Sequence, residues 1–187
     1  MKFKKKDFVT DIAIGFLIFI MGIFLLFTFN SPLDNNNQIL FMVMVLIAML
    51  KFIQYIFTRD LDKRNYEPLL WAISCVLAAC SAVSFNDFNS NYVVTITLLS
   101  WVGVTSIIKL ISIDKMMSKN DETWKIKLID IILFIVTGLV TCLNLYFKVN
   151  DQVIILGFYF CLLGIIELFY PFIGLVVQEI TFNKSKK

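Results

Sequence analysis

Residues 8–29 read FVTDIAIGFLIFIMGIFLLFTF, an apolar run in which Asp11 is the single charged residue. A helix needs about 20 mostly apolar residues to cross the hydrocarbon core of a bilayer, so this run is long enough. Lysines precede it, as in a secretory signal peptide, but the apolar region of such a peptide has roughly 7–15 residues and ends at a small-residue cleavage site. This run is longer and no such site follows, so we expect it to be a membrane span.

Five more apolar runs of similar length follow along the chain. They occupy residues 38–57, 68–86, 92–113, 126–147 and 152–173. Isolated strands leave backbone groups unsatisfied in lipid, and the runs lack the alternation of apolar and polar residues that marks a membrane barrel. The sequence therefore predicts an all-α integral membrane protein, in which residues 1–187 form one domain of six transmembrane helices.

The composition agrees with membrane residence and narrows the chemistry. Hydrophobic residues make up 59% of the chain and charged residues 17%, with a mean hydropathy of +0.82. Soluble domains average about half apolar and a quarter charged. The chain has no histidine, which is the commonest general base and metal ligand. It also has no nucleotide-binding loop, zinc-ligand spacing or catalytic triad, so we expect no enzymatic activity and no catalytic, cofactor-binding or metal-binding residues.

The basic residues lie almost entirely on one side of the predicted spans. The connections 30–37 and 87–91 contain no Lys or Arg, and 148–151 contains only Lys148, whereas the other side holds 14 basic residues. The positive-inside rule places the richer side in the cytoplasm. We therefore expect a multi-pass protein of the cytoplasmic membrane with both termini cytoplasmic. A net charge of +3 gives no indication of nucleic-acid binding.

The chain aligns to itself at a shift of 58 residues without gaps. Lys51, Lys109 and Glu167 fall in one column of this alignment. The repeats cover approximately residues 8–58, 66–116 and 124–174, and each contains one helical hairpin. Two spans per repeat give all three repeats the same orientation, which predicts three tandem hairpins related by a pseudo-threefold axis along the membrane normal.

Small side chains recur within the spans, where they let helices approach closely. We expect six glycines to be packing sites: Gly15, Gly22, Gly103, Gly138, Gly157 and Gly164. The four cysteines are Cys75, Cys80, Cys142 and Cys161, and none forms a Cys-x-x-Cys motif. Free cysteine behaves as a small hydrophobe, so we expect these to be buried thiols.

The architecture resembles a known family. Three tandem hairpins in under 200 residues, with the pair Gly22-Ile23 and the stretch 164–168 (GIIEL), are similar to the HdeD-type acid-resistance membrane proteins of bacteria. The resemblance covers about residues 8–175. In that family a glycine tends to recur in the second helix of each hairpin, whereas this chain has Ala48, Ser106 and Gly164. The resemblance implies a role in envelope or acid stress and supplies no catalytic motif.

Lys51, Lys109 and Glu167 form a candidate intramembrane polar cluster, because ionisable side chains within spans are costly and often functional. Two readings stay open for these residues. In one, both lysines extend to the cytoplasmic headgroups while their stems lie on apolar surface. In the other, the repeat brings the three side chains together and Glu167 pairs with a lysine. Pro171 favours a polar spot there, because it leaves the carbonyl of Glu167 without its helical partner.

Further polar and aromatic residues lie near the inner ends of the predicted helices. Four acidic residues are near helix N-termini, where they complement the helix dipole: Asp7, Asp11, Glu67 and Asp130. Lys127 is the expected partner of Asp130. Trp124 and Trp71 are near the inner interface, where aromatic side chains serve as anchors.

Two functions follow as expectations. The first is a small non-enzymatic protein of the HdeD type, in contact with the lipid bilayer and self-assembling through its lipid-facing surface. The second is a small-solute transporter or substrate-capturing permease subunit with an unidentified ligand. A transporter requires a cavity with convergent polar groups that opens to one face, whereas a scaffold requires a packed bundle.

Substituting Glu167→Gln should lower stability or activity more than Lys148→Gln, because only Glu167 lies inside a predicted span. Thermal unfolding of both variants in detergent measures the difference. Equal and negligible effects would remove the candidate cluster from consideration.

Overall fold

The computed structural model describes residues 5–27, 36–57, 66–84, 90–118, 124–148 and 151–184. The helices are α1 (Lys5–Phe27), α2 (Asn36–Phe57), α3 (Glu67–Ser84), α4 (Ser90–Met117), α5 (Trp124–Phe147) and α6 (Gln152–Lys184). Within these ranges all regular structure is helical, and each helix is long and apolar enough to cross a membrane. The prediction of six apolar helices of membrane-spanning length is confirmed. Arg59, Lys63 and Arg64, which enter the predicted orientation, lie outside the described residues.

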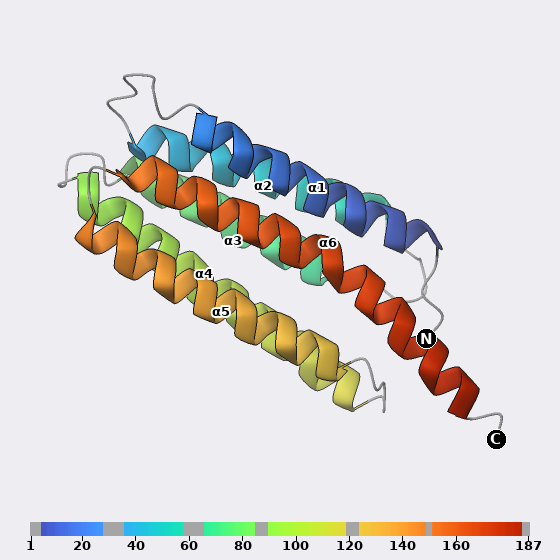
Figure 1. Ribbon diagram of the computed structural model, residues 1–187. Coiled ribbons are helices and arrows are strands. Elements are labelled where there is room, and N and C mark those ends of the chain that lie inside the picture. The colour runs from blue at the N-terminus through green and yellow to red at the C-terminus, as the bar shows by residue number, and fades with distance from the viewer. Residues whose placement is uncertain are drawn as a thin grey trace.

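The helices form one bundle in which α1 begins and α6 ends at the same end (Figure 1). The most extensive contacts join α1 to α6, α2 to α3 and α4 to α5. The two helices of each consecutive hairpin contact one another less. Each hairpin is therefore held mainly by its neighbours, and α1 against α6 closes the bundle between the first and last hairpins.

Helix α6 is longer than the predicted span. The predicted span ends at residue 173, but the helix continues to Lys184 and contains Pro171 in its interior. A proline removes one backbone hydrogen bond, and neighbouring helices often allow a membrane helix to continue past it.

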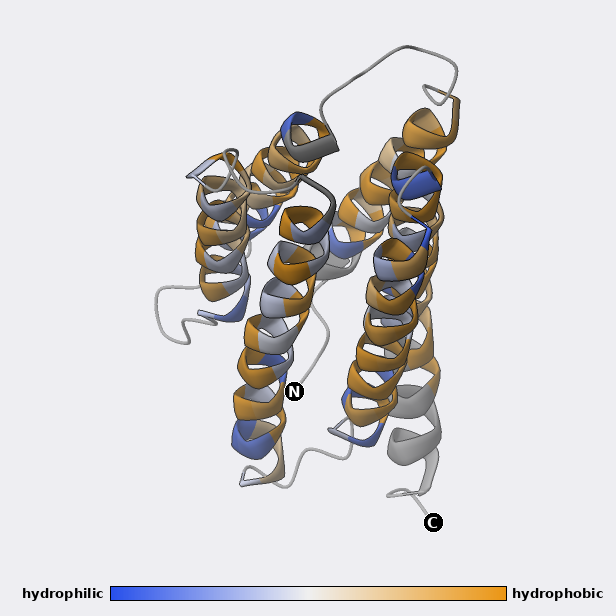
Figure 2. Cartoon of the chain, turned by 90° about the vertical axis from the view of Figure 1, so that its left-hand side faces the viewer, coloured by the Kyte–Doolittle hydropathy of each residue, from blue (hydrophilic) through white to orange (hydrophobic). Residues whose placement is uncertain are grey.

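Apolar side chains cover the outside of the bundle. Figure 2 shows hydrophobic residues along most of each helix, and large side chains such as Phe27 and Leu143 are 80% and 60% exposed. Soluble monomers rarely expose contiguous apolar patches above a few hundred Å². The outer surface therefore fits contact with lipid.

A layer of aromatic side chains fills the middle of the bundle. The rings of Trp101 and Phe134 are 5.7 Å apart between centroids, and those of Trp101 and Tyr159 are 6.4 Å apart, both in edge-on geometry. Edge-on pairs at this distance are favourable. All three side chains are fully or almost fully buried, so this layer is part of the hydrophobic core of the bundle.

Four glycines bring α1 and α6 into close contact. A Cβ atom on Gly164 would lie 2.6 Å from the Cα atom of Phe19, and one on Gly15 would lie 2.7 Å from the backbone nitrogen of Leu168. Gly22 and Gly157 face each other across the same seam. These distances leave no room for a side chain, so glycine is required for the two backbones to approach this closely.

The small residues elsewhere behave less uniformly than predicted. Gly138 packs on Val102 of α4, in agreement with the prediction. The prediction is wrong for Gly103, which is exposed and has no atom within 4 Å of its Cβ position. It is also wrong for Cys80, which is exposed while the other three cysteines are buried. Both exposed residues are apolar enough to face lipid at little cost.

Gly164→Ala should destabilise the protein by about 1–3 kcal/mol, because the added methyl group pushes α1 away from α6. Unfolding by SDS titration in mixed micelles measures the change. Gly103→Ala is the matched control, since its methyl group enters open space. Equal stability of the two variants would contradict the close packing at this seam.

Candidate functional site

The three ionisable residues of the repeat column meet inside the bundle. The Lys51 Nζ atom of α2 is 3.1 Å from Glu167 Oε2 of α6, and the Lys109 Nζ atom of α4 is 3.4 Å from Glu167 Oε1. Both lysines are only 2% exposed. The structure therefore places them in ion pairs in the interior, and not along the lipid-facing surface as the alternative reading required.

Asp130 of α5 completes the cluster. Its Oδ2 atom lies 2.7 Å from Lys109 Nζ, which is the shortest distance to either carboxylate that this lysine contacts. Two lysines and two carboxylates then balance in charge, as burial in a medium of low dielectric constant requires. We call Lys51, Lys109, Asp130 and Glu167 the charge cluster.

Sequence reasoning paired Asp130 with Lys127, one helical turn away, and that pairing is wrong. The bond of Asp130 to Lys109 joins two helices and depends on how α4 and α5 rotate against each other. Helical spacing within α5 carries no information about that rotation. One signal was available: the residues 58 and 116 positions before Asp130 are Ala72 and Ile14. At a shift of 58 residues, Asp130 is therefore the one acidic residue in its column, and it supplies the second negative charge of the cluster.

The indole ring of Trp71 covers the charge cluster on the side of α3. Lys51 Nζ lies 3.8 Å and Lys109 Nζ 4.7 Å from the centroid of this ring. Lys109 Nζ also lies 4.9 Å from the ring of Phe134. A desolvated cation over an aromatic face gains about 2 kcal/mol. Trp71 is 3% exposed, so its predicted role as an interfacial anchor is wrong.

A second set of polar contacts lies one helical turn nearer the end at which α1 begins. Lys127 bonds to Glu67 and donates a hydrogen bond to Ser112 Oγ over 2.7 Å. Ser112 Oγ in turn donates to Glu67 Oε2 over 2.7 Å. Gln54 donates to Asp11 of α1. With the charge cluster, these contacts draw at least one polar side chain from every helix, and we call the whole set the inner polar layer.

In the inner polar layer, buried lysines and carboxylates neutralise one another. Each buried lysine of the described chain, Lys51, Lys109 and Lys127, contacts a carboxylate. Among the described residues, no three Cys, Asp or Glu side chains gather as metal ligands would. These lysines and carboxylates thus form ion pairs with each other, and the ion pairs stabilise one particular packing of the six helices.

Comparison with protein families, curated proteins and solved structures finds no match for this chain.

Asp130→Leu and Lys109→Met should each destabilise the protein by about 3–5 kcal/mol, because each leaves a buried charge without its closest partner. The double variant should recover most of that loss, since both charges are then removed and Lys51 still neutralises Glu167. Unfolding of the four proteins by SDS titration completes the double-mutant cycle. Additive losses would show that the two side chains act independently.

Proposed function

We propose that this chain is a non-enzymatic, multi-pass protein of the cytoplasmic membrane, of the HdeD type, which serves the envelope response to acid stress. The observation that carries the proposal is the pairing of every described buried lysine with a carboxylate inside the bundle. A nucleophile or a solute-binding charge has to be available to a substrate, whereas these charges are occupied by one another.

The aromatic layer supports the same proposal. Trp101, Phe134 and Tyr159 pack together in the core beside the charge cluster, and all are fully or almost fully buried. A solute pathway needs polar groups that line a continuous cavity. A packed bundle of this kind suits a structural or sensing role in the membrane.

The proposal includes three hairpins related by a pseudo-threefold axis. The most extensive contacts follow one pattern, in which the second helix of each hairpin packs on the first helix of the next. They join α2 to α3, α4 to α5 and, closing the ring, α6 to α1. The residues of the column at 51, 109 and 167 meet within this ring. Both termini are cytoplasmic in the proposal, on the strength of the 14 basic residues against one.

A small-solute transporter is the second candidate, and one observation favours it. Among the described residues, buried polar atoms without a hydrogen-bond partner include Trp71 Nε1, Asp130 Oδ1 and Tyr159 Oη. Such atoms usually bond to something, and a solute or internal water can do so. A metabolite that raises the unfolding temperature of the purified protein, and fails to do so for Asp130→Asn, would favour transport.

Deleting the gene in its own host should reduce survival after acid challenge several-fold, and the wild-type gene should restore it. Glu167→Gln should fail to restore survival because it removes the carboxylate that Lys51 contacts and leaves Lys109 with Asp130 alone, while the exposed Lys148→Gln should succeed. Colony counts after transient exposure to acid give the measurement, with membrane protein levels checked in parallel. Unchanged survival of the deletion strain would overturn the proposed function.

A further inference from the structure

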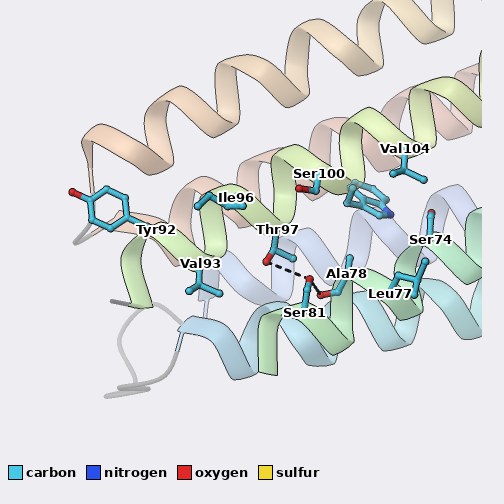
Figure 3. A pocket seen from close by; sticks show the side chains of 11 residues that line it. Ser74, Leu77, Ala78, Ser81, Tyr92, Val93, Ile96, Thr97, Ser100 and Val104 are labelled. Carbon is cyan, nitrogen blue, oxygen red and sulfur yellow. Dashed lines mark hydrogen bonds between the residues drawn. The ribbon is translucent and has the colours of Figure 1, made fainter. Parts of the chain in front are cut away.

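A groove opens between α3 and α4 in the half of the bundle away from the inner polar layer (Figure 3). Its volume is about 560 Å³, within the usual range of ligand pockets, about 300–1,000 Å³. It runs from Tyr92 near the start of α4 to Ser74 and Val104 near the middle of both helices. This cavity takes no part in the proposed function.

Small side chains create the groove. Five of its lining residues are Ser74, Ala78, Ser81, Thr97 and Ser100. The residues 58 positions earlier are Phe16, Ile20, Ile23, Ile39 and Met42, and those 58 positions later are Ile132, Val136, Leu139, Ile155 and Phe158. Large apolar residues thus stand at every equivalent position of the other two hairpins. In this alignment the five small side chains that line the hollow are found only in the second hairpin.

The groove offers hydrocarbon and few free polar groups. Ser74 Oγ donates to the carbonyl of Trp71 over 2.7 Å, and Ser81 Oγ donates to the carbonyl of Ala78 over 2.8 Å. Thr97 Oγ1 accepts from Ser81 over 3.5 Å. Hydroxyls bonded within their own helix pair present mainly their carbon atoms outward. The matching occupant is therefore an apolar chain and not a polar solute.

The length of the groove corresponds to one leaflet. Tyr92 and Val104 are twelve residues apart on α4, which is about 18 Å along a helix. Half of a hydrocarbon core about 30 Å thick is about 15 Å. The groove is therefore about as long as the part of one lipid chain that lies in a single leaflet.

The groove is open to the membrane along its side. Leu77 and Ile96, which border it, are 63% and 62% exposed. At its outer end Tyr92 lies 5.8 Å from Tyr146 between ring centroids, and tyrosines of this kind gather at the level of the headgroups. A chain can therefore enter sideways from the bilayer while its headgroup stays at the surface beside Tyr92.

We propose that this groove binds one acyl chain of a membrane glycerolipid, drawn from the leaflet opposite the inner polar layer. The chain lies along α4 from Tyr92 toward Val104, on the small residues of α3. The binding site of the acyl chain is separate from the charge cluster. Lipid binding in the groove can therefore be tested independently of the proposed function.

The test fills the groove with residues that the third hairpin already carries. Ser100→Phe and Ala78→Val introduce the residues found at 158 and 136, and Leu143→Phe adds an aromatic ring on an exposed face of α5 outside the groove. The full-length proteins are placed in phosphatidylcholine nanodiscs whose acyl chains are brominated near their middle. Quenching of Trp101, which lines the groove, is obtained by subtracting the signal of Trp101→Phe.

Both groove variants should reduce the quenching of Trp101 by about two-fold or more, because the added side chain occupies the volume of the lipid chain. Leu143→Phe should leave it unchanged. Native mass spectrometry should show one retained lipid on the wild type and on Leu143→Phe, and none on Ser100→Phe. Equal quenching in all four proteins would overturn the proposal. So would a wild-type dimer that Ser100→Phe converts to a monomer, since a second copy would then occupy the groove.

Discussion

Two buried lysines set the main constraint on this protein. An ammonium group in the low-dielectric interior of a membrane protein is costly unless a carboxylate lies beside it. Lys51 and Lys109 come from helices that are not consecutive, and each contacts Glu167 of a third helix. The bundle must therefore bring α2, α4 and α6 together at one depth. Every other helix is then placed around that meeting point.

The remaining parts of the structure serve this arrangement in different ways. Asp130 brings the second negative charge, and Trp71 covers both lysines with an aromatic face. The glycines between α1 and α6 allow the last helix to approach closely enough to hold Glu167 in place. In lipid, where apolar surfaces gain little by meeting each other, such polar contacts and close backbone approaches are what determine which helices pack together.

The membrane spans were predictable because they depend on length and hydrophobicity, which are local properties of the chain. The meeting of Lys51, Lys109 and Glu167 was also predictable, because aligning the chain to itself at a shift of 58 residues puts these three ionisable residues in one column. The partners that the odd-numbered helices contribute, Asp130 of α5 and Trp71 of α3, were not predictable. Whether Asp130 faces Lys109 or Lys127, and whether Trp71 faces the interior or the headgroups, depends on the rotation of each helix. That rotation is fixed by tertiary packing, and the apolar residues around each helix carry no clear stripe from which to read it.

The sequence separation of the cluster has a consequence for biosynthesis. Glu167 follows Lys51 by 116 residues, and a ribosome adds about 5–20 residues per second, so the carboxylate emerges roughly 6–23 s after the lysine. During that interval α2 is already made while its acidic partner does not yet exist. The nascent hairpins must hold Lys51 at the edge of the membrane or within the insertion machinery until the last helix arrives. The final helix is thus the step that commits the chain to its mature packing, and a polypeptide stalled before it would present an uncompensated cation to the quality-control proteases of the membrane.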